Sequence, residues 1–282
     1  MADKPSTAAG YTSEHLELVR STCLYVATKL GDLMNELVIV GGLVPSLLID
    51  QQALPDGTEA HVGTTDLDVG LTVALLDEGR YTALTERLRR AGFSPDTNQE
   101  GNPTRQRWKI EVAAKVTVDF LIQPTRPEDR GGGLRDIEAD FAAFILPGLH
   151  LAFEDRVPVT LSGQTIFGEN ASRHVWVCGP GAFVVLKALA FDGRGDNKDA
   201  YDLFYLVRNY GNGVVDVAES LRPLIGDESA KKAMELLRRD FLDHDGLGPR
   251  RVAEFLVGGP DDEIQADVVG FFRELLASLE KA

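Results

Sequence analysis

The sequence has few of the residues that tie a fold together covalently or bind a metal through sulfur. Only two cysteines, Cys23 and Cys178, occur among its 282 residues, and neither belongs to a CxxC or Cys/His pattern. This scarcity argues against a disulfide framework and against a structural zinc site. It makes a reducing cytoplasm the expected compartment.

Basic side chains are also scarce. The chain has 29 Lys and Arg against 44 Asp and Glu, a formal net charge of −15 at pH 7, and its isoelectric point is near 4.8. Such a surface repels phosphate backbones, which disfavours a general nucleic-acid-coating role. A polynucleotide would need the few basic residues to gather in one cleft.

Long apolar runs are missing too. The longest, residues 38–49, is interrupted by glycine, proline and serine and is too short to span a bilayer. Residues 1–10 have no apolar centre, so we expect a frayed tail rather than a signal peptide. Hydrophobic residues still make up 44% of the chain, which predicts a soluble globular protein with a substantial core and no membrane partner.

The first part of the chain alternates helical and strand patterns. Apolar spacing predicts helices over residues 13–33, 44–49 and 78–91, and strands over 36–40, 64–73, 107–112 and 116–122, the last two joined by a turn at 113–115. This alternation predicts an α/β (α+β) fold, with a mixed sheet and flanking helices.

The second part is predicted to be mainly helical. Two prolines, three glycines and several charges in residues 124–133 indicate a junction between a catalytic domain, 1–124, and a C-terminal domain, 136–282. We expect a helix at 137–146, strands at 157–161 and 164–167 around a Ser162-Gly163 turn, and a strand at 174–177. Helices then begin at Gly179-Pro180 and continue over 198–208, 215–224, 229–240, 249–255 and 264–279.

Three aspartates are the strongest candidates for chemistry. Asp66 and Asp68 are two residues apart on a predicted strand, so both project from one face. Asp119 lies on the predicted strand 116–122 and would join them if that strand pairs beside residues 69–73. Three converging carboxylates suit two Mg²⁺ ions in phosphoryl transfer, whereas an isolated acidic pair is more often simply solvent-facing.

A glycine pair precedes these carboxylates. Gly41-Gly42 lies between a predicted strand and a predicted helix, where backbone N–H groups and the helix terminus can receive a triphosphate that a Cβ would obstruct. Alone, a Gly-Gly pair usually marks only a turn.

The order of these motifs is more specific than any one of them. Val40-Gly-Gly, Thr65-Asp-Leu-Asp and Val118-Asp119 together resemble the nucleotidyltransferase fold of the DNA polymerase β superfamily. Downstream, the segments Leu186–Arg194 and Lys198–Phe204 resemble the AbiEii/AbiGii toxin branch, which includes the MenT tRNA nucleotidyltransferase toxins. The resemblance covers residues 38–206.

This resemblance implies a Mg²⁺-dependent toxin of a type IV-like toxin–antitoxin system, which adds nucleotides from an NTP to the 3′ end of tRNA and has a cognate antitoxin protein. It implies a helical C-terminal domain that completes the active site. By motif, Asp66 and Asp68 match the metal-binding pair of the family, Lys187 matches the lysine that faces the nucleotide phosphates, and Asp199 or Asp202 matches the acidic residues of the KDxxD motif. Together with the physical interpretation of the residues, this predicts Asp66, Asp68, Asp119, Lys187 and Asp202 as catalytic residues, with the three N-terminal aspartates as metal ligands. The predicted nucleotide-binding residues are Gly41, Gly42, Thr65, Lys187, Arg194, Lys198 and Asp199.

The segment around Lys187 also has a physical interpretation. Lys187 lies on an apolar helix, where an ammonium is costly unless it meets an anion, and a nucleotide phosphate is one such anion. Lys198 and Asp202 have the spacing of an i, i+4 ion pair after an Asp196 or Asn197 cap. The simpler alternative is that Lys198, Asp199 and Asp202 form a solvated helix face.

Other residues are weaker candidates. Arg105 and Arg107 flank a strand near the expected cleft and could bind phosphate or a base, although edge-strand solubility explains them more simply. His61 precedes the acidic pair, where we expect a solvated loop histidine.

Two other functions fit the same residues. One is a nucleotidyltransferase for a cationic small molecule such as an aminoglycoside, which the acidity favours. The other is a catalytically silent protein that binds a nucleotide or a protein partner, against which the intact Asp66 and Asp68 pair argues.

Overall fold

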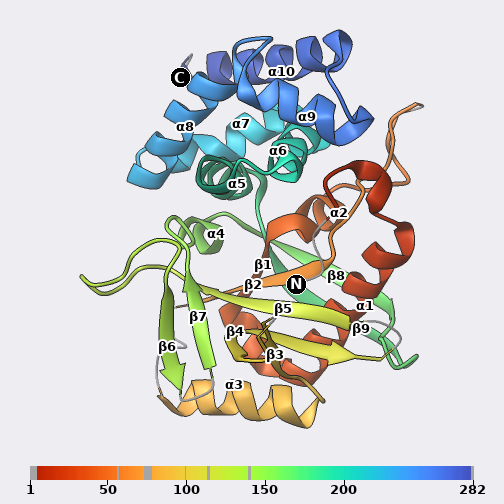
Figure 1. The fold of residues 1–282 in the computed structure, drawn as a ribbon, viewed down its shortest axis with the longest axis vertical. Coiled ribbons are helices and arrows are strands. Elements are labelled where there is room, and N and C mark those ends of the chain that lie inside the picture. The colour runs from red at the N-terminus through yellow and green to blue at the C-terminus, as the bar shows by residue number, and fades with distance from the viewer. Residues whose placement is uncertain are drawn as a thin grey trace. The chain divides into compact units, whose positions relative to one another are not determined.

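The chain is a mixed α/β protein with many helices (Figure 1). The computed structural model describes residues 5–55, 57–72, 78–98, 100–112, 115–138 and 141–280. These residues form two compact units. The first contains residues 13–43 and 64–178, and the second contains residues 5–12, 44–63 and 179–280. The second unit is therefore assembled from segments that are far apart in the sequence.

The first unit is built on one mixed sheet. Its described strands are β1 (Leu37–Val40), β2 (Asp66–Leu71), β3 (Ser94–Thr97), β4 (Pro103–Glu111), β5 (Lys115–Ile122), β6 (Leu134–Glu138), β7 (Phe141–Ile145), β8 (Arg156–Gln164) and β9 (Asn170–Cys178). The strand order is β3-β4-β5-β2-β1-β9-β8, with β7 paired to β5 and β6 paired to β7. The pairs β1–β9, β2–β5 and β5–β7 are parallel, so the predicted mixed sheet is confirmed.

Helices complete the first unit. They are α1 (Ser13–Leu30), α3 (Glu78–Arg90), the short α4 (Leu151–Glu154), and the 3₁₀ turns η2 (Gly31–Glu36) and η3 (Gly41–Leu43). The apolar face of α1, including Cys23, Leu24 and Val26, is fully buried against β8, β9 and α3. Burial of this apolar face is the main contribution of α1 to the stability of the sheet.

The second unit is helical. It contains η1 (Ala8–Gly10), α2 (Val44–Leu48), α5 (Pro180–Arg194), α6 (Asn197–Asn209), α7 (Val214–Leu221), η5 (Arg222–Leu224), α8 (Glu228–Phe241), α9 (Leu247–Val257) and α10 (Asp262–Glu280). Pro180 occupies the first turn of α5, as predicted. Of the two predicted caps, Asp196 is the one that caps α6, accepting a hydrogen bond from the Lys198 N–H. No helix among the described residues is long and apolar enough to cross a membrane.

The predicted helix at 137–146 is wrong. Its described residues instead lie in β6 and β7, and β7 continues the sheet as a parallel neighbour of β5, with Leu121 opposite Phe144. Phe141, Ala142, Ala143 and Ile145 are buried there. A short, fully apolar run fits a buried strand as well as a helix, and the open edge of β5 decides between them.

The predicted turn at Ser162-Gly163 is also wrong. Strand β8 runs straight through both residues, and Ser162 pairs with Ser172 of β9. The hairpin turns later, where the Thr165 N–H bonds to the Glu169 carbonyl and Gly168 adopts a φ of 77°. Gly168 supplies the left-handed conformation that a tight turn requires.

Two other predictions concern the domain division and the N-terminal tail. The division at 124–136 differs from the compact units, because β7 to β9 continue the same sheet and the helical segment begins at Gly179. Within the segment expected to be a frayed tail, Ala8–Gly10 form η1, and the ring centroids of the following Tyr11 and of Phe255 lie 5.8 Å apart; residues 1–4 lie outside the described residues. The turn residues 113 and 114, and residue 73 of the predicted strand 64–73, lie outside the described residues.

Candidate active site

The three predicted metal ligands lie together on the sheet of the first unit. Parallel pairing places Asp68 opposite Asp119, and Asp66 opposite Thr117. Ligand atoms of Asp66, Asp68 and Asp119 all lie within 4.8 Å of one another. The strand alternation that makes Asp66 and Asp68 share a face therefore brings all three carboxylates to one point, as predicted.

A threonine hydroxyl orients the most buried of these carboxylates. Thr64 Oγ1 donates to Asp66 Oδ1 at 2.8 Å. Thr65, the predicted nucleotide-binding residue, is half-buried and directly precedes β2. The signal that could have identified Thr64 is its i, i+2 spacing from Asp66, which is typical of a local side-chain hydrogen bond.

The glycine turn has a direct steric relation to the carboxylates. Gly41 has a φ of 74°, and a Cβ added to it would lie 2.0 Å from Asp68 Oδ2 and 2.8 Å from Asp68 Cγ. Antiparallel pairing sets Val40 opposite Asp68, so the chain turns immediately over the Asp68 carboxylate. Only glycine combines this backbone conformation with the space that Asp68 occupies.

Arg107 is a basic side chain that contacts the triad, but it is not a free phosphate ligand. On β4 it lies opposite Asp119, and its Nε and Nη2 donate to Asp119 Oδ1 and Oδ2 at 2.7 and 2.5 Å. This pair raises the pKa of Arg107 against the opposing effect of burial, and Asp66 and Asp68 add to the increase. The second predicted arginine, Arg105, pairs with Asp136 at 2.8 Å.

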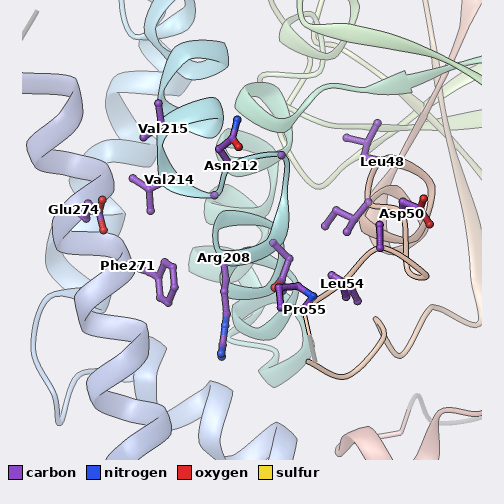
Figure 2. Close-up of a pocket in the computed structure, with 15 residues that line it drawn as sticks. Leu48, Asp50, Leu54, Pro55, Arg208, Asn212, Val214, Val215, Phe271 and Glu274 are labelled. Atoms are coloured by element: carbon purple, nitrogen blue, oxygen red, sulfur yellow. The ribbon is translucent and has the colours of Figure 1, made fainter. Parts of the chain in front are cut away.

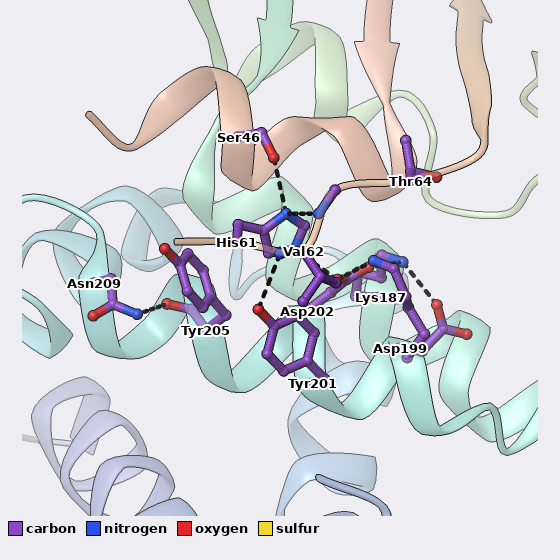
Figure 3. Close-up of polar contacts among 12 residues, drawn as sticks. Ser46, His61, Val62, Thr64, Lys187, Asp199, Tyr201, Asp202, Tyr205 and Asn209 are labelled. Atoms are coloured by element: carbon purple, nitrogen blue, oxygen red, sulfur yellow. Dashed lines mark hydrogen bonds and ion pairs between the residues drawn. The ribbon is translucent and has the colours of Figure 1, made fainter. Parts of the chain in front are cut away.

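The predicted lysine and its acidic motif form a buried cluster in the second unit (Figure 3). Lys187 Nζ on α5 lies 2.7 Å from Asp199 Oδ1 and 2.8 Å from Asp202 Oδ2, both on α6. Lys198 Nζ lies 2.6 Å from Asp202 Oδ1, the predicted i, i+4 pair. The solvated-face alternative is therefore wrong, since all four side chains are buried.

Arg194 closes the exposed side of this cluster. Its Nε and Nη2 donate to Asp199 at 2.5 and 2.8 Å, while its side chain remains 56% exposed. Gly195 ends α5 in the left-handed conformation directly after it. Three cations, Lys187, Lys198 and Arg194, thus surround two carboxylates in a chain whose overall charge is strongly negative.

Burial and charge set the protonation of the cluster. Burial alone would lower the pKa of Lys187, but Asp199 and Asp202 outweigh it, so the net pKa is raised. Burial likewise opposes ionisation of Asp202, yet Lys187, Lys198 and His61 hold its pKa far below the ordinary value. Burial lowers the pKa of Lys198, with Asp202 acting against it. The cluster is a charged network inside the fold.

His61 is the functional candidate that the sequence analysis missed. It is buried rather than solvated, and its Nε2 lies 2.9 Å from Asp202 Oδ1. The Gly63 N–H points at Nδ1 over 3.1 Å, and the Ser46 hydroxyl lies 2.9 Å from the same nitrogen. Because a backbone N–H can only donate, Nδ1 accepts and the proton lies on Nε2, facing Asp202.

Packing keeps this imidazole neutral. The rings of Tyr201 and Tyr205 lie 5.4 and 4.9 Å from that of His61. Burial lowers the pKa of His61 to about 4, although the bond to Asp202 acts in the opposite direction. No sequence signal pointed to His61, because its partner Asp202 is 141 residues away.

The second unit also contains a cavity with no predicted role (Figure 2). Its volume is about 570 Å³, and its walls include Leu48, Leu54, Arg208, Val214, Phe271 and Glu274. The lining mixes apolar side chains with isolated charges. None of the residues predicted to carry chemistry is among those that line it.

No protein-family model matches the chain, and no curated protein matches it. Among solved structures, the chain is similar to an antigenic nucleotidyltransferase-like protein from Paracoccidioides brasiliensis, with 15% sequence identity, a TM-score of 0.39, and coverage of 80% of this chain and 94% of that one.

Proposed function

We propose that the protein is a metal-dependent nucleotidyltransferase whose catalytic carboxylates are Asp66, Asp68 and Asp119. The observation that carries this proposal is the convergence of these three side chains, with ligand atoms within 4.8 Å of one another, on the paired strands β2 and β5. Like charges repel at such distances, so this grouping favours a bound cation.

The donor set fits Mg²⁺. Carboxylate oxygens are the hard ligands that this ion prefers, and Gly41 leaves the space in which the Asp68 carboxylate lies. Mg²⁺ bound there would activate an acceptor hydroxyl and stabilise the charge of the transferring phosphoryl group. The protein's own part is to hold the oxygens in place, through the Thr64 hydroxyl on Asp66 and the strand register on Asp68 and Asp119.

The second unit is proposed to bind the nucleotide through Lys187 and Arg194. With Lys198, these residues bring three positive charges to two carboxylates, so the cluster carries a net positive charge when His61 is neutral. An ammonium has three N–H donors and a guanidinium has five, so both groups can bond to phosphate oxygens besides their internal partners. Asp202 would position Lys187, and His61 would position Asp202.

For the acceptor, we propose the 3′ end of tRNA, in a toxin with a cognate antitoxin, on the motif resemblance alone. A cationic small molecule is the second candidate, and a specific observation favours it. The three arginines considered as phosphate ligands, Arg105, Arg107 and Arg194, each have a carboxylate partner, and the chain is strongly acidic. Polynucleotide binding would have to overcome both.

One assay separates these functions. The protein is incubated with each α-labelled NTP and Mg²⁺, together with total tRNA or with a panel of aminoglycosides. Labelled tRNA supports the first acceptor and a labelled small molecule supports the second, whereas the absence of any transfer favours a silent binding protein. Asp66→Asn should abolish transfer, while Asp136→Asn should not, because Asp136 is an exposed carboxylate of the same sheet outside the triad.

A further inference from the structure

Arg107 binds the carboxylate of Asp119, one of the three proposed metal ligands. Both oxygens of Asp119 accept from its guanidinium, at 2.7 and 2.5 Å. The Arg107 side chain is only 19% exposed and that of Asp119 only 15%. This is a bidentate, largely buried pair rather than a surface ion pair, so it is well ordered and charge-assisted.

The pair conflicts with the role proposed for Asp119. A divalent ion held by Asp66, Asp68 and Asp119 needs an oxygen of Asp119 as a ligand. The guanidinium already bonds to both of these oxygens, and its positive charge opposes the approach of a second cation. Ligand atoms of Asp66 and Asp68 lie within 4.8 Å of that of Asp119, so the charge of the guanidinium on Asp119 acts on the whole triad.

We infer that Arg107 is the internal counter-cation of the triad, and that a divalent ion binds by displacing it from Asp119. The inference rests on the proposed metal site. Without metal, the guanidinium relieves the mutual repulsion of the three carboxylates and keeps Asp119 in place. With metal, the same guanidinium is a competitor, so the protein binds divalent ions more weakly than its three carboxylates alone would.

The size of the competition follows from Coulomb's law. At the effective dielectric constant of about 20 that holds near a protein surface, two unit charges about 4 Å apart repel strongly enough to change a binding constant by well over tenfold. A divalent ion beside the guanidinium experiences this repulsion with twice the charge. Removal of the guanidinium should therefore tighten metal binding by about tenfold or more.

The test measures Mn²⁺ affinity directly, from the electron paramagnetic resonance signal of the free ion. Arg107→Gln should bind Mn²⁺ at least about tenfold more tightly than the unmodified protein. The matched control is Arg105→Gln, because Arg105 lies two residues away on the same strand and pairs with Asp136 instead of the triad. This control should leave the affinity within about twofold. Adding Asp119→Asn to Arg107→Gln should remove the gain.

A second variant and a second measurement distinguish the proposed charge effect from misfolding. Arg107→Lys keeps the charge but loses the bidentate fork, so its Mn²⁺ affinity should fall between those of the unmodified protein and Arg107→Gln. In chelator, Arg107→Gln should melt at a lower temperature than Arg105→Gln, because carboxylate repulsion is no longer relieved.

The outcomes are distinguishable. Equal or weaker Mn²⁺ binding by folded Arg107→Gln and Arg107→Lys overturns the inference and leaves the metal site standing. Absence of Mn²⁺ binding in every form of the protein removes the metal site itself, and with it the proposed function.

Discussion

Substitution of Gly41 by alanine tests the link between the glycine turn and the carboxylates. Two effects are expected. The first is conformational, because a non-glycine residue at a φ of 74° costs about 1–2 kcal/mol. The second is steric, because the new Cβ would lie 2.0 Å from Asp68 Oδ2, so the carboxylate must move by more than about 1 Å to restore van der Waals contact.

A matched control separates the two effects. Gly168, in the β8–β9 turn, has a φ of 77°, and a Cβ added there meets nothing within 4 Å. Gly168→Ala should therefore incur the conformational cost alone, about 1–2 kcal/mol, or a decrease in Tm of about 2–8 °C. Gly41→Ala should lose comparable or greater stability, and in addition about 100-fold in nucleotide transfer, since a 1 Å misplacement of a reacting group costs about that much.

The assay is single-turnover transfer of labelled nucleotide, with denaturant titration as the stability measurement. The decisive comparison is the ratio of the two activities at a temperature where both variants are folded. If Gly41→Ala retains the activity of Gly168→Ala, the contact between Gly41 and Asp68 has no bearing on the chemistry, and the role proposed for Asp68 is in error.

Three further predictions follow from the charged groups. Because burial lowers the pKa of His61 from 6.5 to about 4, the unfolded chain takes up a proton between these pH values that the folded chain does not. The unfolding free energy should therefore fall by about 3 kcal/mol as the pH falls from 6.5 to 4; a His61→Gln variant with the same slope in urea titrations would contradict this. Lys187→Ala leaves two buried carboxylates without a shared cation, so it should cost about 3–5 kcal/mol of stability and weaken NTP binding, and equal NTP affinity by calorimetry would exclude the nucleotide role. Saturating Mg²⁺, at about 100 times its Kd, should stabilise the unmodified protein by about 2.7 kcal/mol but not Asp66→Asn or Asp68→Asn, and an unchanged Mg²⁺ response in melting curves would remove both residues from the metal site.

The sequence predicted the features that depend on local periodicity. Alternation along a strand is enough to place Asp66 and Asp68 on one face, and a cap residue is enough to start α6. The position of Asp119 beside them required the assumption that its strand pairs with the strand of Asp66 and Asp68. The register of β2 with β5 confirms this pairing.

The remaining features depend on partners far away in the sequence. Residues 141–145 have no strand signature of their own, and they become a strand because β5 offers an open edge. The protein groups that neutralise Lys187 could not be identified from a helical pattern, and they are two carboxylates on α6. The same limit applies to Arg107. The sequence favoured a solvent-exposed residue on an edge strand, and the register of β4 with β5 shows that Arg107 lies opposite Asp119.

The discontinuous second unit has a consequence for biosynthesis. Residues 44–63 leave the ribosome long before α6, since His61 and Asp202 are separated by 141 residues. At about 5–20 residues per second, this segment waits on the order of ten seconds for its partner. Ile49 lacks its buried neighbours Tyr201, Tyr205 and Phe255 for that time. The nascent chain therefore passes through a stage in which the sheet of the first unit can fold. At that stage residues 44–63, which interrupt the sequence of this unit, are still exposed to chaperones and proteases.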